Sequence, residues 1–239
     1  GNITSAAEHA VALLFAAARN ISKADRDMKA GLWNKKGCTG VELSGKKLGI
    51  VGLGKVGNIV ANVARSLDME IMVADPYLTA NRASEMDVRK VEVTELLQQA
   101  DFVSVHAPLT SETENMIGLE QLRMMKPTAR LINAARGGIV NEAELAQALA
   151  DGTIAGAALD VYANEPLEEG SPLRNLDTIT HTPHLGASTE EAQTRVAENI
   201  AEQFVDYFTK GIIHNAVNLD VRLNPRIAPF ARLADTLGQ

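Results

Sequence analysis

The sequence predicts an α/β protein built on a doubly wound parallel sheet of about six or seven strands. Short apolar runs recur along the chain, and patterns typical of helices separate them. A glycine-rich turn follows the first of these runs and leads into a helix. Alternation of strand and helix at this spacing is typical of parallel βαβ units, in which helices connect neighbouring strands.

The predicted strands are continuous apolar segments that are too brief for buried helices. They are residues 48–51, 70–74, 101–105, 130–134, 155–160 and 178–180, with a weaker run at 88–91. Because the apolar residues are continuous rather than alternating, we expect helices to cover both faces of the sheet.

Helices are predicted between these strands. Residues 55–67 place apolar side chains on one face at helical spacing, and residues 94–99 form a shorter helix. Another helix begins at Asn141, with Glu144 three residues further on, which is close to a capping-box pattern. Gly152 marks its end.

Two longer helices flank this unit. One, residues 5–20, opens with the capping-box pair Ser5 and Glu8, and the other, residues 188–210, opens at Ser188. We expect their broad apolar faces to pack on a second domain or a second subunit and to be partly exposed in this chain. The predicted organisation is a domain-crossing helix region at 1–36, a dinucleotide-binding domain at 37–187, a returning helix at 188–210, and a linker with the start of a further segment at 211–239.

Composition and charge exclude several classes of protein. The chain has 239 residues, 46% hydrophobic and 22% charged, which is enough apolar material for a sizeable core. A net charge of −7 argues against a nucleic-acid surface, and no apolar run reaches the length of about 18 residues that a membrane span needs. No secretory signal is visible, and Cys38 is the single cysteine, so we expect a reducing, cytoplasmic location. No metal-ligand spacing occurs, so no metal is predicted.

The turn after the first strand has the spacing of a phosphate-binding loop. It reads Gly52-Leu53-Gly54-Lys55-Val56-Gly57, and Asp75 ends the second strand. Gly52 permits a tight turn, Gly54 lets the backbone approach a pyrophosphate, and Gly57 lets helix and strand pack closely. The free N–H groups at the helix start would bind the phosphates. In this setting the motif predicts a Rossmann-type dinucleotide site.

The acid at the end of the second strand predicts which dinucleotide binds. Asp75 would accept hydrogen bonds from the ribose hydroxyls and repel a 2′-phosphate, which favours NAD over NADP. The alternative is a glycine-rich turn with a capping acid and no ligand.

Three polar residues follow the carboxyl ends of strands, the edge where ligands bind in open α/β sheets. They are Arg136, Glu165 and His184. Each has a simpler interpretation: Arg136 as a surface turn residue, Glu165 as a solvated loop acid, and His184 as a cap of the long helix that follows. His181 competes with His184, but its place at a strand end predicts a packed side chain. Together with a dinucleotide site on the same edge, the three residues predict a catalytic set.

Four blocks of the sequence resemble the NAD-dependent D-isomer-specific 2-hydroxyacid dehydrogenases. They are GLGKVG, AARGGIVNEAELAQAL, GAALDVYANEP and HTPHLGASTEEAQ. The resemblance covers about residues 1–220. The blocks GNITSAAEHAV and HLGASTEEAQ most resemble those family members that act in serine biosynthesis and whose substrate is a phosphorylated 2-hydroxy acid.

The resemblance implies a role for each candidate. His184 would take the proton of the C2 hydroxyl as hydride leaves for the nicotinamide, Glu165 would hold the other ring nitrogen, and Arg136 would bind the substrate carboxylate. The implied cofactor contacts are Lys55 and Val56 at the pyrophosphate, Asp75 at the ribose, Ala107 and Pro108 on the adenine side, Ala134, Ala135 and Arg136 near the nicotinamide, Asp160 at its carboxamide, and His184, Gly186 and Ala187 at that end.

The chain departs from the family in one respect. Members carry a further segment before the stretch that resembles GNITSAAEHA, and that segment forms most of the substrate domain and supplies a glycine-rich loop for the substrate carboxylate. We therefore expect a cofactor-binding portion with reduced or no turnover alone. Exposed apolar helix faces would favour a homodimer or homotetramer.

Two other functions stay open at this point. One is another D-2-hydroxyacid dehydrogenase, such as a glyoxylate or hydroxypyruvate reductase, because the parts that read a substrate phosphate lie largely outside this chain. The other is a non-catalytic NAD-sensing module like the transcriptional corepressors that share this fold, which retain a similar set of catalytic residues.

Overall fold

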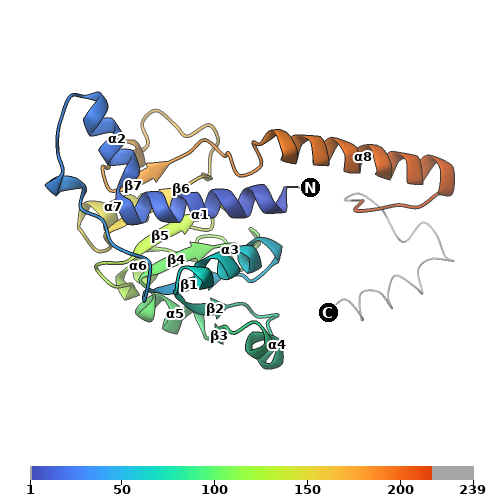
Figure 1. Ribbon diagram of the computed structural model, residues 1–239, viewed down its shortest axis with the longest axis horizontal. Coiled ribbons are helices and arrows are strands. Elements are labelled where there is room, and N and C mark those ends of the chain that lie inside the picture. The colour runs from blue at the N-terminus through green and yellow to red at the C-terminus, as the bar shows by residue number, and fades with distance from the viewer. Residues whose placement is uncertain (1, 217–239) are drawn as a thin grey trace. The chain divides into compact units, whose positions relative to one another are not determined.

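The structure is a computed structural model that describes residues 2–216 (Figure 1). Within this range, seven parallel strands form one sheet in the order β3-β2-β1-β4-β5-β6-β7. The strands are β1 (Lys47–Val51), β2 (Glu70–Ala74), β3 (Arg89–Lys90), β4 (Phe102–Val105), β5 (Arg130–Asn133), β6 (Gly156–Leu159) and β7 (Ile179–His181). The predicted α/β class and strand positions are confirmed, and the weak run forms the edge strand β3. Strand order reverses between β1 and β4, which opens a crevice at the carboxyl edge.

The α-helices of the described range are α1 (Ile3–Arg19), α2 (Ile21–Lys29), α3 (Lys55–Ser66), α4 (Ala80–Glu85), α5 (Val93–Gln99), α6 (Leu119–Met124), α7 (Glu142–Ala150) and α8 (Glu190–Lys210). The start of α7 is confirmed, since Asn141 Oδ1 accepts the Glu144 N–H at 3.1 Å. Helices α2, α4 and α6 were not predicted. Each is short and buries one residue, so no apolar stripe marks it in the sequence.

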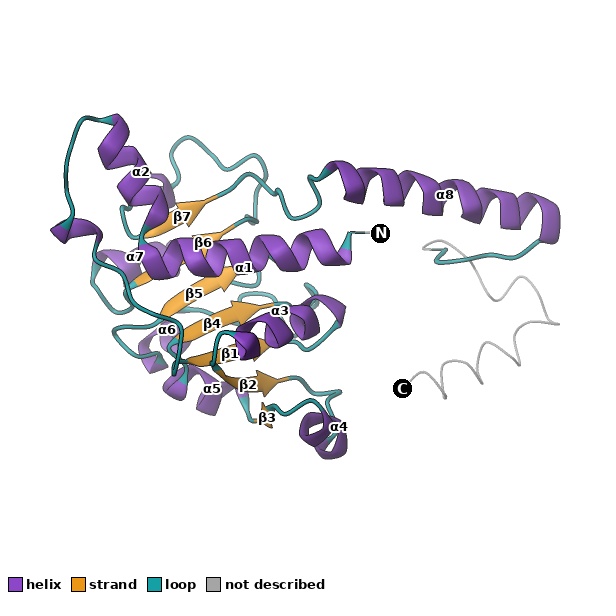
Figure 2. Ribbon diagram, in the orientation of Figure 1, coloured by secondary structure: helices purple, strands orange, loops and turns teal. Residues whose placement is uncertain are grey.

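Helices cover both faces of the sheet, as the continuous apolar strands predict (Figure 2). Helices α1 and α3 pack on one face, where Leu48 and Ile50 of β1 point. Helices α5, α6 and α7 pack on the other, which includes Val51 of β1 and Val103 of β4. This double cover leaves the carboxyl ends of the strands as the free edge of the sheet.

Helix α1 differs from the prediction in its start, and most of its apolar face is buried. It begins at Ile3, so Ser5 is a buried residue inside the helix and not its cap. Most of its apolar face is covered, because β5, β6 and α3 pack against it. The covered residues are Ala7, Ala10, Leu13 and Leu14, each at most 2% exposed. The small alanines let α1 lie close to the sheet, while Phe15, at 37% exposed, leaves part of the apolar surface of this helix uncovered, as predicted.

Helix α8 begins at Glu190, two residues later than predicted. Thr189 rather than Ser188 caps it, since Thr189 Oγ1 accepts the Ala192 N–H at 3.1 Å. Its apolar side is exposed, as predicted, through Val196, Ile200, Phe204, Val205, Tyr207 and Phe208.

The chain divides into two units after Gln193, within α8. The predicted boundaries at residues 36, 187 and 210 stay predictions, and most of the predicted tail, from residue 217 on, lies outside the described residues. Among the helices of the described part, none is long and apolar enough to cross a membrane.

Candidate active site

The glycine loop joins β1 to α3 at the carboxyl edge of the sheet. Gly52 has a φ of +89°, and a Cβ added there would lie 2.9 Å from the Ala107 nitrogen, so the turn requires glycine. Gly57 packs against the Gly52 carbonyl, where a side chain would collide. At Gly54, in contrast, an added Cβ would meet no atom within 4 Å. The backbone is therefore open where a pyrophosphate would approach the start of α3.

Asp75 faces this loop from the end of β2. Its Oδ2 accepts the Leu53 N–H at 2.6 Å, and its Oδ1 accepts the Tyr77 N–H at 2.8 Å. A cavity of about 490 Å³ lies beside them, with Gly54, Lys55 and Asp75 in its wall. Carboxylate oxygens have lone pairs left for ribose hydroxyls, and the helix start supplies donors for phosphate. The residues present therefore fit the adenosine and pyrophosphate parts of a dinucleotide.

The other predicted cofactor residues lie along the same edge. Val56 is in the first turn of α3, and Ala107 and Pro108 follow β4, with Ala107 packed against Gly52. Ala134 and Ala135 follow β5. Their predicted contacts with the cofactor stay predictions.

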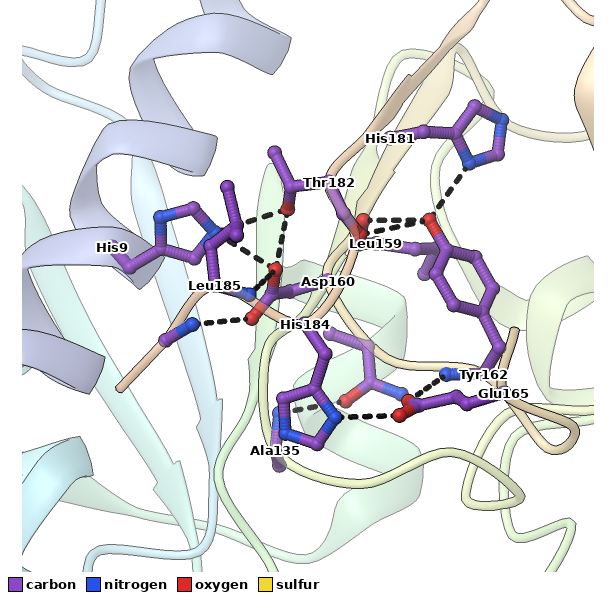
Figure 3. Close-up of polar contacts among 12 residues, drawn as sticks. His9, Ala135, Leu159, Asp160, Tyr162, Glu165, His181, Thr182, His184 and Leu185 are labelled. Carbon is purple, nitrogen blue, oxygen red and sulfur yellow. Dashed lines mark hydrogen bonds and ion pairs between the residues drawn. The ribbon is translucent and has the colours of Figure 1, made fainter. Parts of the chain in front are cut away.

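His184 and Glu165 face each other on the other half of this edge (Figure 3). His184 Nδ1 lies 2.6 Å from Glu165 Oε2, and Glu165 Oε1 accepts the Tyr162 N–H at 3.0 Å. Burial acts to raise the pKa of Glu165, but the hydrogen bonds from His184 and the Tyr162 amide outweigh it and hold that pKa below its usual value. Glu165 is therefore ionised at neutral pH.

The charge of Glu165 decides where the proton of His184 sits. An ionised carboxylate only accepts, so neutral His184 carries its proton on Nδ1. The lone pair of Nε2 is then free, on a side chain that is 49% exposed. Such a ring can take a proton from a hydroxyl, and Glu165 would stabilise the imidazolium that forms.

Asp160 holds the backbone that carries His184. Its carbonyl accepts the His184 N–H at 2.8 Å, and its carboxylate accepts the N–H of Leu185 at 2.7 Å and of Gly186 at 2.9 Å. His184 adopts a left-handed φ of +57°, a conformation that costs about 1 kcal/mol and that these bonds hold in place. The predicted contact of Asp160 with the nicotinamide carboxamide stays a prediction; in the structure, the protein's own donors surround its carboxylate.

The protonation of Asp160 follows from those donors. Burial acts to raise the pKa of Asp160, but hydrogen bonds from His9, Thr182 and the Leu185 amide outweigh it and lower that pKa. The side chain is 1% exposed, so Asp160 is a buried carboxylate that stays charged because it is fully hydrogen-bonded.

Arg136 lies on the loop after β5 with its side chain exposed, and its Nη1 donates to the Ala135 carbonyl at 2.6 Å. Asn133 shapes this loop: its Nδ2 donates to the Arg136 carbonyl at 3.0 Å and its Oδ1 accepts the Ala135 N–H at 3.1 Å. Gly137 packs against the Tyr162 carbonyl, so the Arg136 loop lies beside the loop that carries Glu165. The predicted contact of Arg136 with a substrate carboxylate stays a prediction.

His181 is packed, as predicted. Its Nε2 lies 3.0 Å from the Leu173 carbonyl, and its Nδ1 lies 3.0 Å from the Tyr162 hydroxyl, which also lies 3.2 Å from the carbonyls of Leu159 and Thr182. Burial lowers the pKa of His181 and raises that of Tyr162 to about 12. Both ring nitrogens are engaged, so His184, and not His181, has a nitrogen free for proton transfer.

Two residues of this region were not among the predicted site residues. His9 of α1 and Thr182, just after β7, contact Asp160 Oδ1 at 3.0 Å and 2.6 Å (Figure 3). His9 is 151 positions away from Asp160, so no local pattern predicts the contact. The one available signal was the place of His9 in the block GNITSAAEHAV. Within residues 2–216, no group of three or more His, Cys, Asp or Glu side chains could hold a metal ion.

A glycine loop with Asp75 beside it, and an ionised Glu paired with His on the same edge, are typical of a dinucleotide-binding α/β protein with an acid–base pair. The profile of the family described as "D-isomer specific 2-hydroxyacid dehydrogenase, NAD binding domain" matches residues 11–186. The chain belongs to this family, and the cofactor of its domain is NAD.

Curated relatives and solved structures agree with this assignment. The D-3-phosphoglycerate dehydrogenases of Synechocystis sp. and Archaeoglobus fulgidus are each 45% identical over 100% of this chain, which covers 43% and 46% of their lengths. The chain thus spans a little under half the length of these relatives. A glyoxylate reductase from Paecilomyes thermophila has a TM-score of 0.82 and 32% identity over 90% of this chain and 65% of its own. An NAD-dependent formate dehydrogenase from Staphylococcus aureus, in complex with NAD, has a TM-score of 0.82 and 32% identity over 90% and 64%.

Proposed function

We propose that this chain is the NAD-binding half of a dehydrogenase that oxidises 3-phospho-D-glycerate to 3-phosphohydroxypyruvate, a step of serine biosynthesis. The observation that carries the proposal is the 2.6 Å contact between His184 Nδ1 and Glu165 Oε2, on the same sheet edge as the glycine loop. The relatives named D-3-phosphoglycerate dehydrogenase support the choice of substrate.

Each residue of the pair and its neighbour has a defined task in this reaction. His184 Nε2 accepts the proton of the C2 hydroxyl, and Glu165 stabilises the positive charge that develops on the ring. The Arg136 guanidinium binds the substrate carboxylate with its planar fork. NAD, when bound, supplies the hydride acceptor. The chain without a substrate domain would turn over slowly or not at all.

The exposed apolar side of α8 supports an assembly of more than one chain, and we propose a homodimer or homotetramer in the cytoplasm. Sedimentation of the full-length protein that carries this chain tests this part. A monomer at micromolar concentration would contradict it.

The test of catalysis is His184→Gln in that full-length protein. We expect turnover of 3-phospho-D-glycerate with NAD to fall by about 1,000-fold or more, because the general base is lost, while calorimetry shows unchanged NADH binding. His214→Gln is the matched control, since His214 is exposed and contacts Asp206 at 3.0 Å.

Three outcomes would contradict parts of the proposal. Retained turnover in His184→Gln would overturn the role of His184. Faster turnover of glycolate or D-glycerate than of 3-phospho-D-glycerate would contradict the proposed substrate. Absence of turnover together with a protein partner whose binding depends on NADH would instead support a non-catalytic NAD-sensing module.

A further inference from the structure

Two side chains from different segments, His9 and Thr182, meet at one oxygen of the buried Asp160 carboxylate (Figure 3). His9 Nε2 of α1 lies 3.0 Å from Asp160 Oδ1 and 3.0 Å from Thr182 Oγ1, and Thr182 Oγ1 lies 2.6 Å from Asp160 Oδ1. The proposed reaction does not use His9 or Thr182. Their arrangement nevertheless places α1 in direct polar contact with the loop that carries His184.

The chemistry of the three groups fixes the direction of each hydrogen bond. Asp160 is ionised and only accepts, so the single hydroxyl proton of Thr182 goes to Asp160. His9 must then donate its Nε2–H, shared between the carboxylate and the Thr182 oxygen. His9 is therefore one of the donors that keep a buried charge satisfied, with a side chain that is 18% exposed against 1% for Asp160.

The Asp160 carboxylate also determines the path of the loop that carries His184. Asp160 accepts the N–H groups of Leu185 and Gly186, and its carbonyl accepts that of His184. Gly186 also packs on α1: a Cβ added there would lie 3.8 Å from the Ala6 Cα and 3.3 Å from Asp160 Oδ2. A shift of His9 or of α1 is therefore transmitted to the backbone on both sides of the His184 side chain.

We propose that His9 is a positioning residue that acts through Asp160 and Thr182 to aim His184 Nε2 at the substrate hydroxyl. The proposal rests on the proposed function, because it assigns His9 a task in the same proton transfer. Displacement of a reacting group by about 1 Å can lower a rate by about 100-fold, so a network that holds this loop affects the chemical step more than binding.

A purely structural role for His9 makes a different prediction. Helix α1 is already anchored by its buried apolar face on the sheet, which includes Leu13 and Leu14. If His9 only helped to anchor α1, its loss would lower the free energy of unfolding and leave the rate constant of the folded protein unchanged. If His9 instead positions His184, its loss should lower kcat with little change in KM, and kcat should depend on whether the side chain at position 9 has an N–H donor.

The experiment compares four variants in the full-length protein that carries this chain. His9→Leu removes the donor, His9→Gln retains an N–H donor, Thr182→Val removes the hydroxyl at nearly constant shape, and His214→Leu is the exposed control. We expect kcat to fall by about 10- to 100-fold in His9→Leu and Thr182→Val, with KM for NAD changed less than about threefold. His9→Gln should recover most of the loss, and His214→Leu should behave like the unmodified protein.

A spectroscopic readout keeps this test separate from that of the proposed function. In nitrogen-15 NMR of the histidine rings, His9→Leu should shift or broaden the signal of the His184 Nδ1 proton, and His9→Gln should restore it. Unchanged kcat together with an unchanged His184 signal in folded His9→Leu and Thr182→Val would overturn the proposal. If the unmodified protein shows no turnover, the proposed function fails, while the His184 signal still decides whether His9 positions that ring.

Discussion

The two halves of the carboxyl edge are built in different ways. Around the glycine loop, local backbone conformation and one side chain from the neighbouring strand end hold the geometry: Gly52 takes a left-handed φ, Gly57 packs on a carbonyl, and the Asp75 carboxylate accepts two backbone N–H groups. Around His184, side chains from distant segments do so, since Asp160 gathers donors from α1 and from the loop after β7. The first half relies on local conformation and the second on a buried charge.

This difference determines how each half responds to substitution. In an exposed loop that is held by its backbone conformation, removal of a side chain should change ligand binding but have little effect on the free energy of unfolding. A buried carboxylate needs its donors, and the donors need it, so removal of either leaves an uncompensated polar group in the core. We therefore expect changes around Asp160 to affect folding and changes around Asp75 to affect binding.

The largest expected effect on stability is at Asp160. Asp160→Ala removes the acceptor of His9, Thr182 and two backbone N–H groups, and we expect it to lower the free energy of unfolding by about 3 kcal/mol. Urea denaturation of this chain at neutral pH measures the loss. Asp75→Ala is the comparison, because Asp75 is partly exposed and should change the same quantity by less than about 1 kcal/mol. Equal losses in the two variants would remove the distinction between the halves.

The sequence was more informative about the glycine-loop half, for the same physical reason. The spacing of Gly52, Gly54 and Gly57, with Asp75 at the next strand end, is a local pattern that reports a local geometry. His184 and Glu165 could be found as polar residues after strand ends, but their pairing depends on how two loops fold together.

Contacts that depend on tertiary structure could not be predicted from the sequence patterns. His9 reaches Asp160 only because α1 packs on the sheet beside β6, and Ser5, which matches a helix cap by residue type, is buried within the same helix. In both cases the packing of α1 decides the environment of a polar residue, and a local pattern does not encode that packing.

His106 gives the glycine-loop half a dependence on pH. It follows β4 beside the Gly52 turn, its Nε2 lies 2.9 Å from Ser104 Oγ, and burial lowers its pKa from 6.5 to about 4. Below pH 6.5 the His106 ring is protonated in the unfolded chain, whereas in the folded chain it stays neutral down to about pH 4. The contribution of His106 to stability is therefore fully present above pH 6.5 and is lost progressively as the pH decreases from 6.5 toward 4.

Urea denaturation of this chain and of His106→Gln between pH 7 and pH 4 checks the expectation. The variant should have a flatter profile, and the difference between the two profiles isolates His106 from His181, whose pKa burial also lowers. Parallel profiles would mean that His106 does not contribute, and that the glycine-loop half has no titrating side chain of this kind.

The smallest expected effect is on cofactor binding at Asp75, and it tests whether this half depends on charge or on backbone support. Asp75→Ala removes the negative charge and the acceptors of both the Leu53 and the Tyr77 N–H groups, whereas Asp75→Asn removes the charge and keeps one oxygen that can accept the Leu53 N–H. Loss of the ribose contact should weaken NADH binding by about tenfold, or 1.4 kcal/mol, and reduce the preference over NADPH. Calorimetric titration with both cofactors measures these changes, and Asp87→Ala, at a side chain that is 91% exposed, is the control.

If Asp75→Asn resembles Asp75→Ala in its affinity for NADH, the charge of Asp75 sets the affinity. If Asp75→Asn binds NADH like the unmodified chain, the carboxylate acts through the shape of the glycine loop, and both halves of the edge then depend on an acid that holds backbone N–H groups in place.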